Sequence, residues 1–259
     1  MEKGATFFIT THSSIAIDQF SNDPLAQIYH ISHNGKNAVS TPVDTYAEGR
    51  SILDDLGIRA SDVLQSNGVI WVEGPSDRIY INKWIDLWSN SSLHENVQYQ
   101  CVFYGGGTLD HLSAEFSQDA DDLIKIFTLN RNAIIVMDSD KKSEADEIKE
   151  TKKRILDEIG KSGSGLCWIT KGREIENYIP ASAISKLIKR DSEKRNVGQF
   201  DSFPEYLNSI IPGLGTQYDK NKVPCSKEIR NHLTKDNCNM LDLNDKMNET
   251  ILQIEKWNQ

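Results

Sequence analysis

An apolar run that ends in an acidic residue constrains the fold of this 259-residue chain more than any other feature. The run is Val69–Val72; Glu73 and Gly74 follow it, and a second carboxylate lies at Asp77. Short continuous apolar runs are typical of strands buried on both faces of a parallel sheet. Pro75 suits the first turn of a helix, where a missing N–H breaks no hydrogen bond. The segment therefore predicts a buried strand that delivers an acid to a turn, with a helix behind it.

Two further apolar runs, Ala133–Met137 and Leu166–Thr170, repeat the pattern. Acidic pairs follow them: Asp138 and Asp140 after the first, and Glu174 and Glu176 after the second. Open α/β sheets bind ligands beyond the carboxyl ends of their strands, so we expect these acids at one edge of a sheet. Crowded carboxylates repel one another unless a cation neutralises them, and oxygen ligands favour Mg²⁺ or Mn²⁺ over zinc. The pattern therefore predicts a metal site with six candidate ligands: Glu73, Asp77, Asp138, Asp140, Glu174 and Glu176.

The rest of the pattern predicts an α/β fold with about four mainly parallel strands flanked by helices. Ile81, Trp84, Ile85 and Trp88 recur at helical spacing and predict a helix that covers the sheet. A further strand is expected at Tyr99–Phe103, and three glycines, Gly105 to Gly107, follow it. The charged segment from Lys141 to Glu158 predicts a solvated helix. The chain after Pro180 predicts only helices, over 181–190, 203–211, 226–234 and 241–257.

Composition excludes several classes of protein. Hydrophobic residues make up 38% of the chain and charged residues 26%, which is typical of soluble globular proteins and not of disordered ones. No apolar run reaches the roughly 20 residues of a membrane span, and the N-terminus lacks a signal-peptide core, so we expect a cytoplasmic protein with no membrane partner. The net charge of −9 argues against a generally basic nucleic-acid-binding surface. It is compatible with an acidic pocket that divalent cations fill. The four cysteines lack the spacing of a metal site, so we expect them to be reduced residues of the core.

The order of these motifs carries a family resemblance. Glu73-Gly74 with Asp77, the glycine run, Asp138-x-Asp140 and Glu174-x-Glu176 resemble the TOPRIM domain. The match is to the TOPRIM domain of OLD-family (overcoming-lysogenization-defect) ATP-dependent endonucleases, which include Gabija-type phage-defence nucleases. The resemblance implies a Rossmann-like TOPRIM sheet with a C-terminal helical subdomain.

A segment near the N-terminus resembles part of an ABC-type ATPase. Thr6–Thr11 is an apolar strand candidate that ends in a Thr-Thr-His-Ser turn, and the resemblance makes His12 a nucleotide sensor in a complete ATPase. The chain holds no phosphate-binding G-x-x-x-x-G-K-[ST] loop, so we expect no ATP hydrolysis by this chain alone. ATP would then act only through a complete or partner ATPase domain. The predicted domains are 1–45, the tail of an ATPase domain; 46–66, a connecting helix or linker; 67–180, a TOPRIM nuclease domain; and 181–259, a C-terminal helical subdomain.

The resemblance implies a divalent-metal-dependent endonuclease that cleaves or nicks DNA by a two-metal mechanism in anti-phage defence, as part of an ATPase-containing assembly. Glu73, Asp138 and Asp140 would hold one Mg²⁺ or Mn²⁺ ion, and Asp77 with Glu174 or Glu176 would hold or orient a second. The family also uses a lysine from its C-terminal helical part, and Lys222, just before a predicted helix, is the preferred candidate over Lys220 and Lys227. Two alternatives stay open: a non-catalytic assembly module that keeps the fold, and a TOPRIM nuclease acting on RNA. We expect a homo-oligomer or a hetero-complex, with DNA favoured over RNA.

Overall fold

The computed structural model describes residues 6–11, 20, 25–33, 37–42, 66–104, 124, 127–128, 130–162, 165–189 and 195–259. The chain divides into two units, Met1–Gln65 and Ser66–Gln259, and each is described by itself. The predicted boundaries at residues 45, 66 and 180 stay predictions. No helix among these described ranges is long and apolar enough to cross a membrane.

The first unit contains a β-hairpin. Its strands β1 (Tyr29–His33) and β2 (Ala38–Pro42) pair antiparallel, with Tyr29 opposite Pro42 and His33 opposite Ala38. The strand expected at Thr6–Thr11 is not seen: these described residues have no regular secondary structure, and Phe8 is 95% exposed. The predicted ATPase-like tail is therefore not seen in the described part of this unit, and His12 lies outside the described residues.

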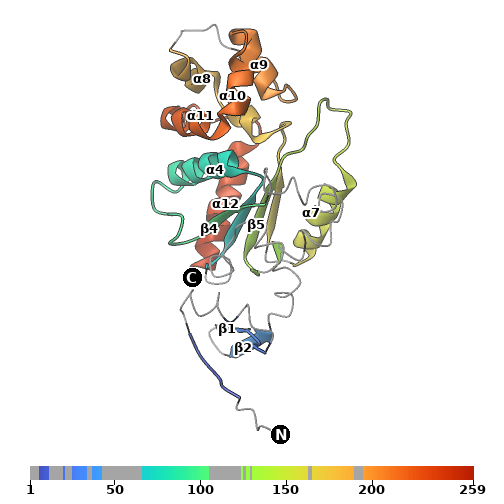
Figure 1. Ribbon diagram of the computed structural model, residues 1–259, viewed down its shortest axis with the longest axis vertical. Coiled ribbons are helices and arrows are strands. Elements are labelled where there is room, and N and C mark those ends of the chain that lie inside the picture. Colours follow the sequence, from blue (N-terminus) through green and yellow to red (C-terminus); the bar gives the residue numbers. More distant parts are fainter. Residues whose placement is uncertain are drawn as a thin grey trace. The chain divides into compact units, whose positions relative to one another are not determined.

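The second unit is built on a four-stranded parallel sheet with the order β4-β3-β5-β6 (Figure 1). Its strands are β3 (Val69–Val72), β4 (Gln100–Phe103), β5 (Ala133–Met137) and β6 (Leu166–Ile169). Trp71 pairs in register with Val102 on one side and with Ile135 on the other. The predicted class, a mainly parallel sheet of about four strands flanked by helices, is confirmed for this unit.

The two central strands are buried on both faces, as their continuous apolar sequences require. Alternate residues point to opposite faces. Ile70 and Val136 belong to the large core under helix α4 (Pro75–Trp88), whereas the Trp71 ring packs against Phe127. The predicted apolar stripe of α4, from Ile81 to Trp88, is buried in that core.

Helix α7 (Glu150–Ser162) packs against β6 and begins later than the charge pattern predicts. The preceding residues form a turn instead, because the Asp146 carboxylate accepts hydrogen bonds from the backbone N–H groups of Lys142 and Ser143. A short acidic side chain that satisfies backbone donors in this way competes with a helix.

The chain after Pro180 is mainly helical, as predicted, and a short 3-10 helix precedes it. The elements after β6 are the 3-10 helix η1 (Ile175–Tyr178), then α8 (Ala181–Leu187), α9 (Phe203–Ile210), α10 (Leu214–Lys220), α11 (Lys222–Ile229), η2 (Arg230–His232) and α12 (Leu243–Trp257). Helices α11 and α12 both pack against α4. The helix predicted from Ser226 starts four residues earlier, so Lys222 is its first residue and does not lie in a preceding loop.

Candidate functional site

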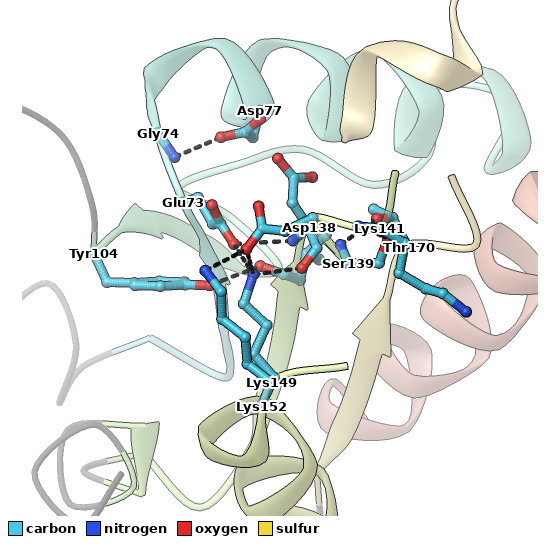
Figure 2. A network of polar contacts seen from close by, with 12 residues as sticks. Glu73, Gly74, Asp77, Tyr104, Asp138, Ser139, Lys141, Lys149, Lys152 and Thr170 are labelled. Carbon is cyan, nitrogen blue, oxygen red and sulfur yellow. Dashed lines mark hydrogen bonds and ion pairs between the residues drawn. The ribbon is translucent and has the colours of Figure 1, made fainter. Parts of the chain in front are cut away.

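Acidic side chains follow three neighbouring strands at the carboxyl edge of the sheet. Glu73 follows β3, Asp138 follows β5, and Glu174 and Glu176 lie in the segment after β6. The three strands are parallel and adjacent, so these chain segments leave the sheet at the same edge. Figure 2 shows the Glu73 and Asp138 side chains close to each other, with Asp77 on the first turn of α4 nearby.

Glu73 and Asp138 are linked directly. The backbone N–H of Asp138 donates to Oε1 of Glu73 over 2.9 Å. Burial raises the pKa of the Asp138 carboxyl well above its usual range, and the negative charges of Glu73 and Asp77 raise it further. A buried carboxyl that feels neighbouring negative charges favours either protonation or a nearby cation.

Asp77 is a buried acid at the start of α4. Its carboxylate accepts a hydrogen bond from the backbone N–H of Gly74, which satisfies a donor at the helix N-terminus. Burial raises the pKa of Asp77 to about 8, helped by the charge of Glu176 and opposed by Lys222. The residue is only 6% exposed, so an ionised Asp77 needs a nearby positive charge.

Asp140 is the most exposed of the six predicted ligands, with 45% of its side chain exposed. Its backbone φ of 59° lies in the left-handed region, which aspartate tolerates better than most residues. Its Oδ2 accepts hydrogen bonds from Lys149 and Lys152, both at 2.9 Å. Partial burial would raise the pKa of Asp140, but these two lysines outweigh it and lower the pKa.

Lys152 is a site residue that the sequence did not indicate. Its ammonium donates to the backbone carbonyl of Asp138 and to Oδ2 of Asp140, and lies 3.4 Å from Oε1 of Glu73. Its side chain is 14% exposed, compared with 42% for the neighbouring Lys153. Burial alone would lower the pKa of Lys152, but Glu73 and Asp140 raise it, so the group stays charged.

The loop that carries Asp138 and Asp140 is tied to the end of β6. The backbone N–H of Ser139 donates to Oγ1 of Thr170 over 2.9 Å, and the Ser139 hydroxyl donates to the Gly172 carbonyl over 2.6 Å. The backbone N–H of Asp140 donates to the Arg173 carbonyl. These bonds fix the acid-bearing loops of β5 and β6 relative to each other. Neither Ser139 nor Thr170 was predicted, although both lie within or beside the acidic motifs.

Glu174 binds the N-terminus of helix α9. Its Oε1 accepts a hydrogen bond of 2.6 Å from the backbone N–H of Phe203, the first residue of α9. Burial raises the pKa of Glu174, and the nearby Glu176 charge adds to the effect. An acid that satisfies a helix N-terminus has one oxygen already committed.

Glu176 is the most buried of the six acids, at 1% exposure. Its Oε1 accepts a 2.9 Å hydrogen bond from the Tyr218 hydroxyl and lies 2.8 Å from the Lys222 ammonium. Its Oε2 is buried and has no hydrogen-bond partner among the residues that the structure describes. Burial alone would lower the pKa of Lys222, but Glu176 raises it above the usual range. The acid after β6 is thus joined to the C-terminal helices.

Within the described ranges, no three acidic, histidine or cysteine side chains converge as a ready-made metal site. The donor chemistry nevertheless suits a hard cation. All six predicted ligands offer oxygen, and among the described residues Oε2 of Glu176 is buried without a hydrogen-bond partner. The Lys152 ammonium lies between the carboxylate oxygens of Glu73 and Asp140 and the backbone carbonyl of Asp138, as a bound cation would. The predicted ligand roles stay predictions, and the glycines at 105–107 lie outside the described residues.

Comparisons with known proteins find a likeness in structure and none in sequence. No known protein family matches the sequence, and no curated protein matches it. The structure is similar to that of the "C-terminal region of the Burkholderia pseudomallei OLD protein", with a TM-score of 0.42 and 12% sequence identity. That match covers 72% of this chain and 98% of the other. Similarity at this level does not identify an activity.

Proposed function

We propose that this chain is a divalent-metal-dependent nuclease that hydrolyses phosphodiester bonds in DNA. The observation that carries the proposal is the group of acids that lie beyond β3, β5 and β6 at one sheet edge, where three of them, Asp77, Asp138 and Glu174, have raised pKa values. Perturbed acids gathered at the ligand-binding edge of an α/β sheet are typical of functional sites. The TOPRIM-like order of the motifs in the sequence supports the same class of reaction.

In this proposal the acids hold two Mg²⁺ or Mn²⁺ ions. Glu73, Asp138 and Asp140 would hold one, and Asp77 with Glu176 would hold or orient the other; Glu174 is less available because it binds the N-terminus of α9. Bound ions of this kind supply a nucleophilic water at neutral pH and stabilise charge on the leaving oxygen. No side-chain nucleophile is then needed.

Lys222 would contact the substrate phosphate. Its ammonium stays charged beside Glu176, and 41% of its side chain is exposed, so the charge is available to an anion. It lies at the N-terminus of α11, whose positive dipole also favours a phosphate. DNA is favoured over RNA, and a role in anti-phage defence within an ATPase-containing assembly follows from the sequence resemblance alone.

A second candidate is a non-catalytic assembly module that keeps the fold. Lysine ammoniums already neutralise the acids at both ends of the edge: Lys152 at Glu73 and Asp140, and Lys222 at Glu176. An acid set that is satisfied internally needs no metal for folding. A non-catalytic module of this kind should gain neither activity nor stability when Mn²⁺ is added.

Plasmid DNA and a structured RNA, incubated in parallel with the chain over a Mn²⁺ titration, distinguish the candidates. We expect metal-dependent nicking of the plasmid that Asp138→Asn and Glu73→Gln abolish. Glu158→Gln, which changes an exposed acid that pairs with Lys161 in α7, is the matched control and should retain activity. Nicking that survives in both site variants, or cleavage of RNA alone, would overturn the proposal.

A further inference from the structure

The Lys152 ammonium occupies the position between the acids that follow β3 and β5. It contacts the Asp138 carbonyl, Asp140 Oδ2 at 2.9 Å and Glu73 Oε1 at 3.4 Å (Figure 2). The contacts come from two different strand ends, and a lysine on α7 bridges them. A compact ammonium with oxygen neighbours on several sides is bound much as a small cation is.

We propose that Lys152 is an internal counter-cation that competes with the divalent ion for the oxygens of Glu73 and Asp140. This inference rests on the proposed function and adds a regulation of the same site: the ion can bind these oxygens only when the lysine leaves them. A divalent ion at these oxygens would lie within a few ångströms of the Lys152 ammonium, and their charges would repel each other. The lysine stem is flexible, so the ammonium can leave while α7 stays in place.

The exchange would involve Lys152 and not the neighbouring Lys149. Lys149 also contacts Asp140 Oδ2 at 2.9 Å, but its side chain is 69% exposed, and among the described residues the ion pair of Glu73 is with Lys152 and not with Lys149. Lys149 can therefore continue to screen Asp140 in solvent, whereas Glu73 would lose its lysine partner. Removing the charge of Lys152 should accordingly have a larger effect on ion binding than removing that of Lys149.

The test replaces Lys152 by methionine, which keeps an apolar stem of similar length and removes the charge. Mn²⁺ affinity is measured without nucleic acid, by titration calorimetry and by the loss of the free-Mn²⁺ electron paramagnetic resonance signal. We expect Lys152→Met to bind Mn²⁺ at least about tenfold more tightly than wild type. Lys149→Met should give a smaller gain. Lys153→Met is the matched control, because Lys153 pairs with Glu147 and Glu150 away from the site, and its affinity should equal that of wild type.

Thermal melts distinguish competition from a purely structural role. In EDTA, Lys152→Met should melt below wild type because Glu73 loses its lysine partner and Asp140 keeps only Lys149. Saturating Mn²⁺ should raise the melting temperature of Lys152→Met by more than that of wild type. A lysine with only a structural role would lower both melting temperatures and leave the Mn²⁺ affinity unchanged.

The outcomes separate the two proposals. If wild type binds Mn²⁺ and Lys152→Met binds it no more tightly, the counter-cation inference is wrong while the proposed function stands. If Lys152→Met binds more tightly but no variant cleaves nucleic acid, the inference holds and the nuclease proposal fails. If neither protein binds Mn²⁺, both are overturned.

Discussion

The Nζ atom of Lys222 lies 2.8 Å from Oε1 of Glu176, and this pair joins the first turn of α11 to the segment that follows β6. Glu176 is almost fully buried, whereas 41% of the lysine side chain is exposed. The C-terminal helices therefore supply the counter-charge for an acid at the sheet edge. The two partners are unequal, because the lysine can regain water when the pair breaks and the carboxylate cannot.

Lys222→Met should destabilise the fold by about 2 to 3 kcal/mol, because it leaves the buried Glu176 carboxylate without its cation. Glu176→Gln should cost less, since the exposed ammonium is rehydrated and the amide oxygen can still accept from Tyr218. The double variant should be more stable than the sum of the two losses predicts. Urea denaturation of the four proteins measures this, with the exposed Lys220→Met as control. Additive losses would show that the pair is not coupled.

The stability of the metal-free protein should fall as pH rises from about 4 to 8. Asp77 has a pKa of about 8 in the folded chain and an ordinary value near 3.8 when unfolded, so the folded state binds more protons over this interval. Its contribution to stability is present at low pH and lost as pH approaches 8, with a slope of at most about 1.4 kcal/mol per pH unit for one proton. The raised pKa of Asp138 acts in the same direction.

The measurement is urea denaturation in EDTA at pH 5, 6, 7 and 8. Asp77→Asn should flatten the dependence and be more stable than wild type at pH 8, whereas Asp157→Asn, an exposed change on α7, should leave the curve unaltered. A wild-type stability that rises over this interval would contradict the assignment of Asp77 as a protonated buried acid.

Gly68 and Gly160 offer a matched pair of glycine substitutions. A Cβ at Gly68 would overlap the ring of Trp257, so Gly68→Ala should cost about 1 to 3 kcal/mol through overpacking. A Cβ at Gly160 meets nothing, and this residue lies in α7, so Gly160→Ala should stabilise by about 0.5 to 1 kcal/mol. Thermal or urea denaturation of both variants checks the sign of each change. Equal effects would show that α12 does not pack tightly on the start of β3.

The fold of the second unit was predictable where local pattern and tertiary environment agree. β3 and β5 are short apolar runs because both of their faces are covered, and the stripe on α4 matches its buried face. Helix α10 was missed because its sequence has little periodicity. Tertiary contacts form it instead: Gly215 lies against the Pro204 carbonyl and donates its N–H to Asn208.

The sequence indicated the acids of the candidate site and Lys222, but it did not indicate Lys152. Acids that follow buried strands are visible because a charge after an apolar run is unusual. Lys152 and Lys153 are adjacent lysines in a charged segment, and only the direction of α7 relative to β5 decides that Lys152 faces the acids. The contact of Glu174 with Phe203 joins residues 29 positions apart, and its two ends carry no shared local pattern.

Mn²⁺ should stabilise the wild-type chain by about 1 to 3 kcal/mol at concentrations well above its dissociation constant, because a ligand that binds only the folded state shifts the unfolding equilibrium. Asp138→Asn should lose this gain, and in EDTA it should melt at or above the wild-type temperature, because it removes a carboxylate crowded by Glu73 and Asp77. Glu158→Gln serves as the control and should keep the full Mn²⁺ gain. Wild-type melts that superimpose with and without Mn²⁺ would show that the acids hold no ion and that the lysines alone neutralise them.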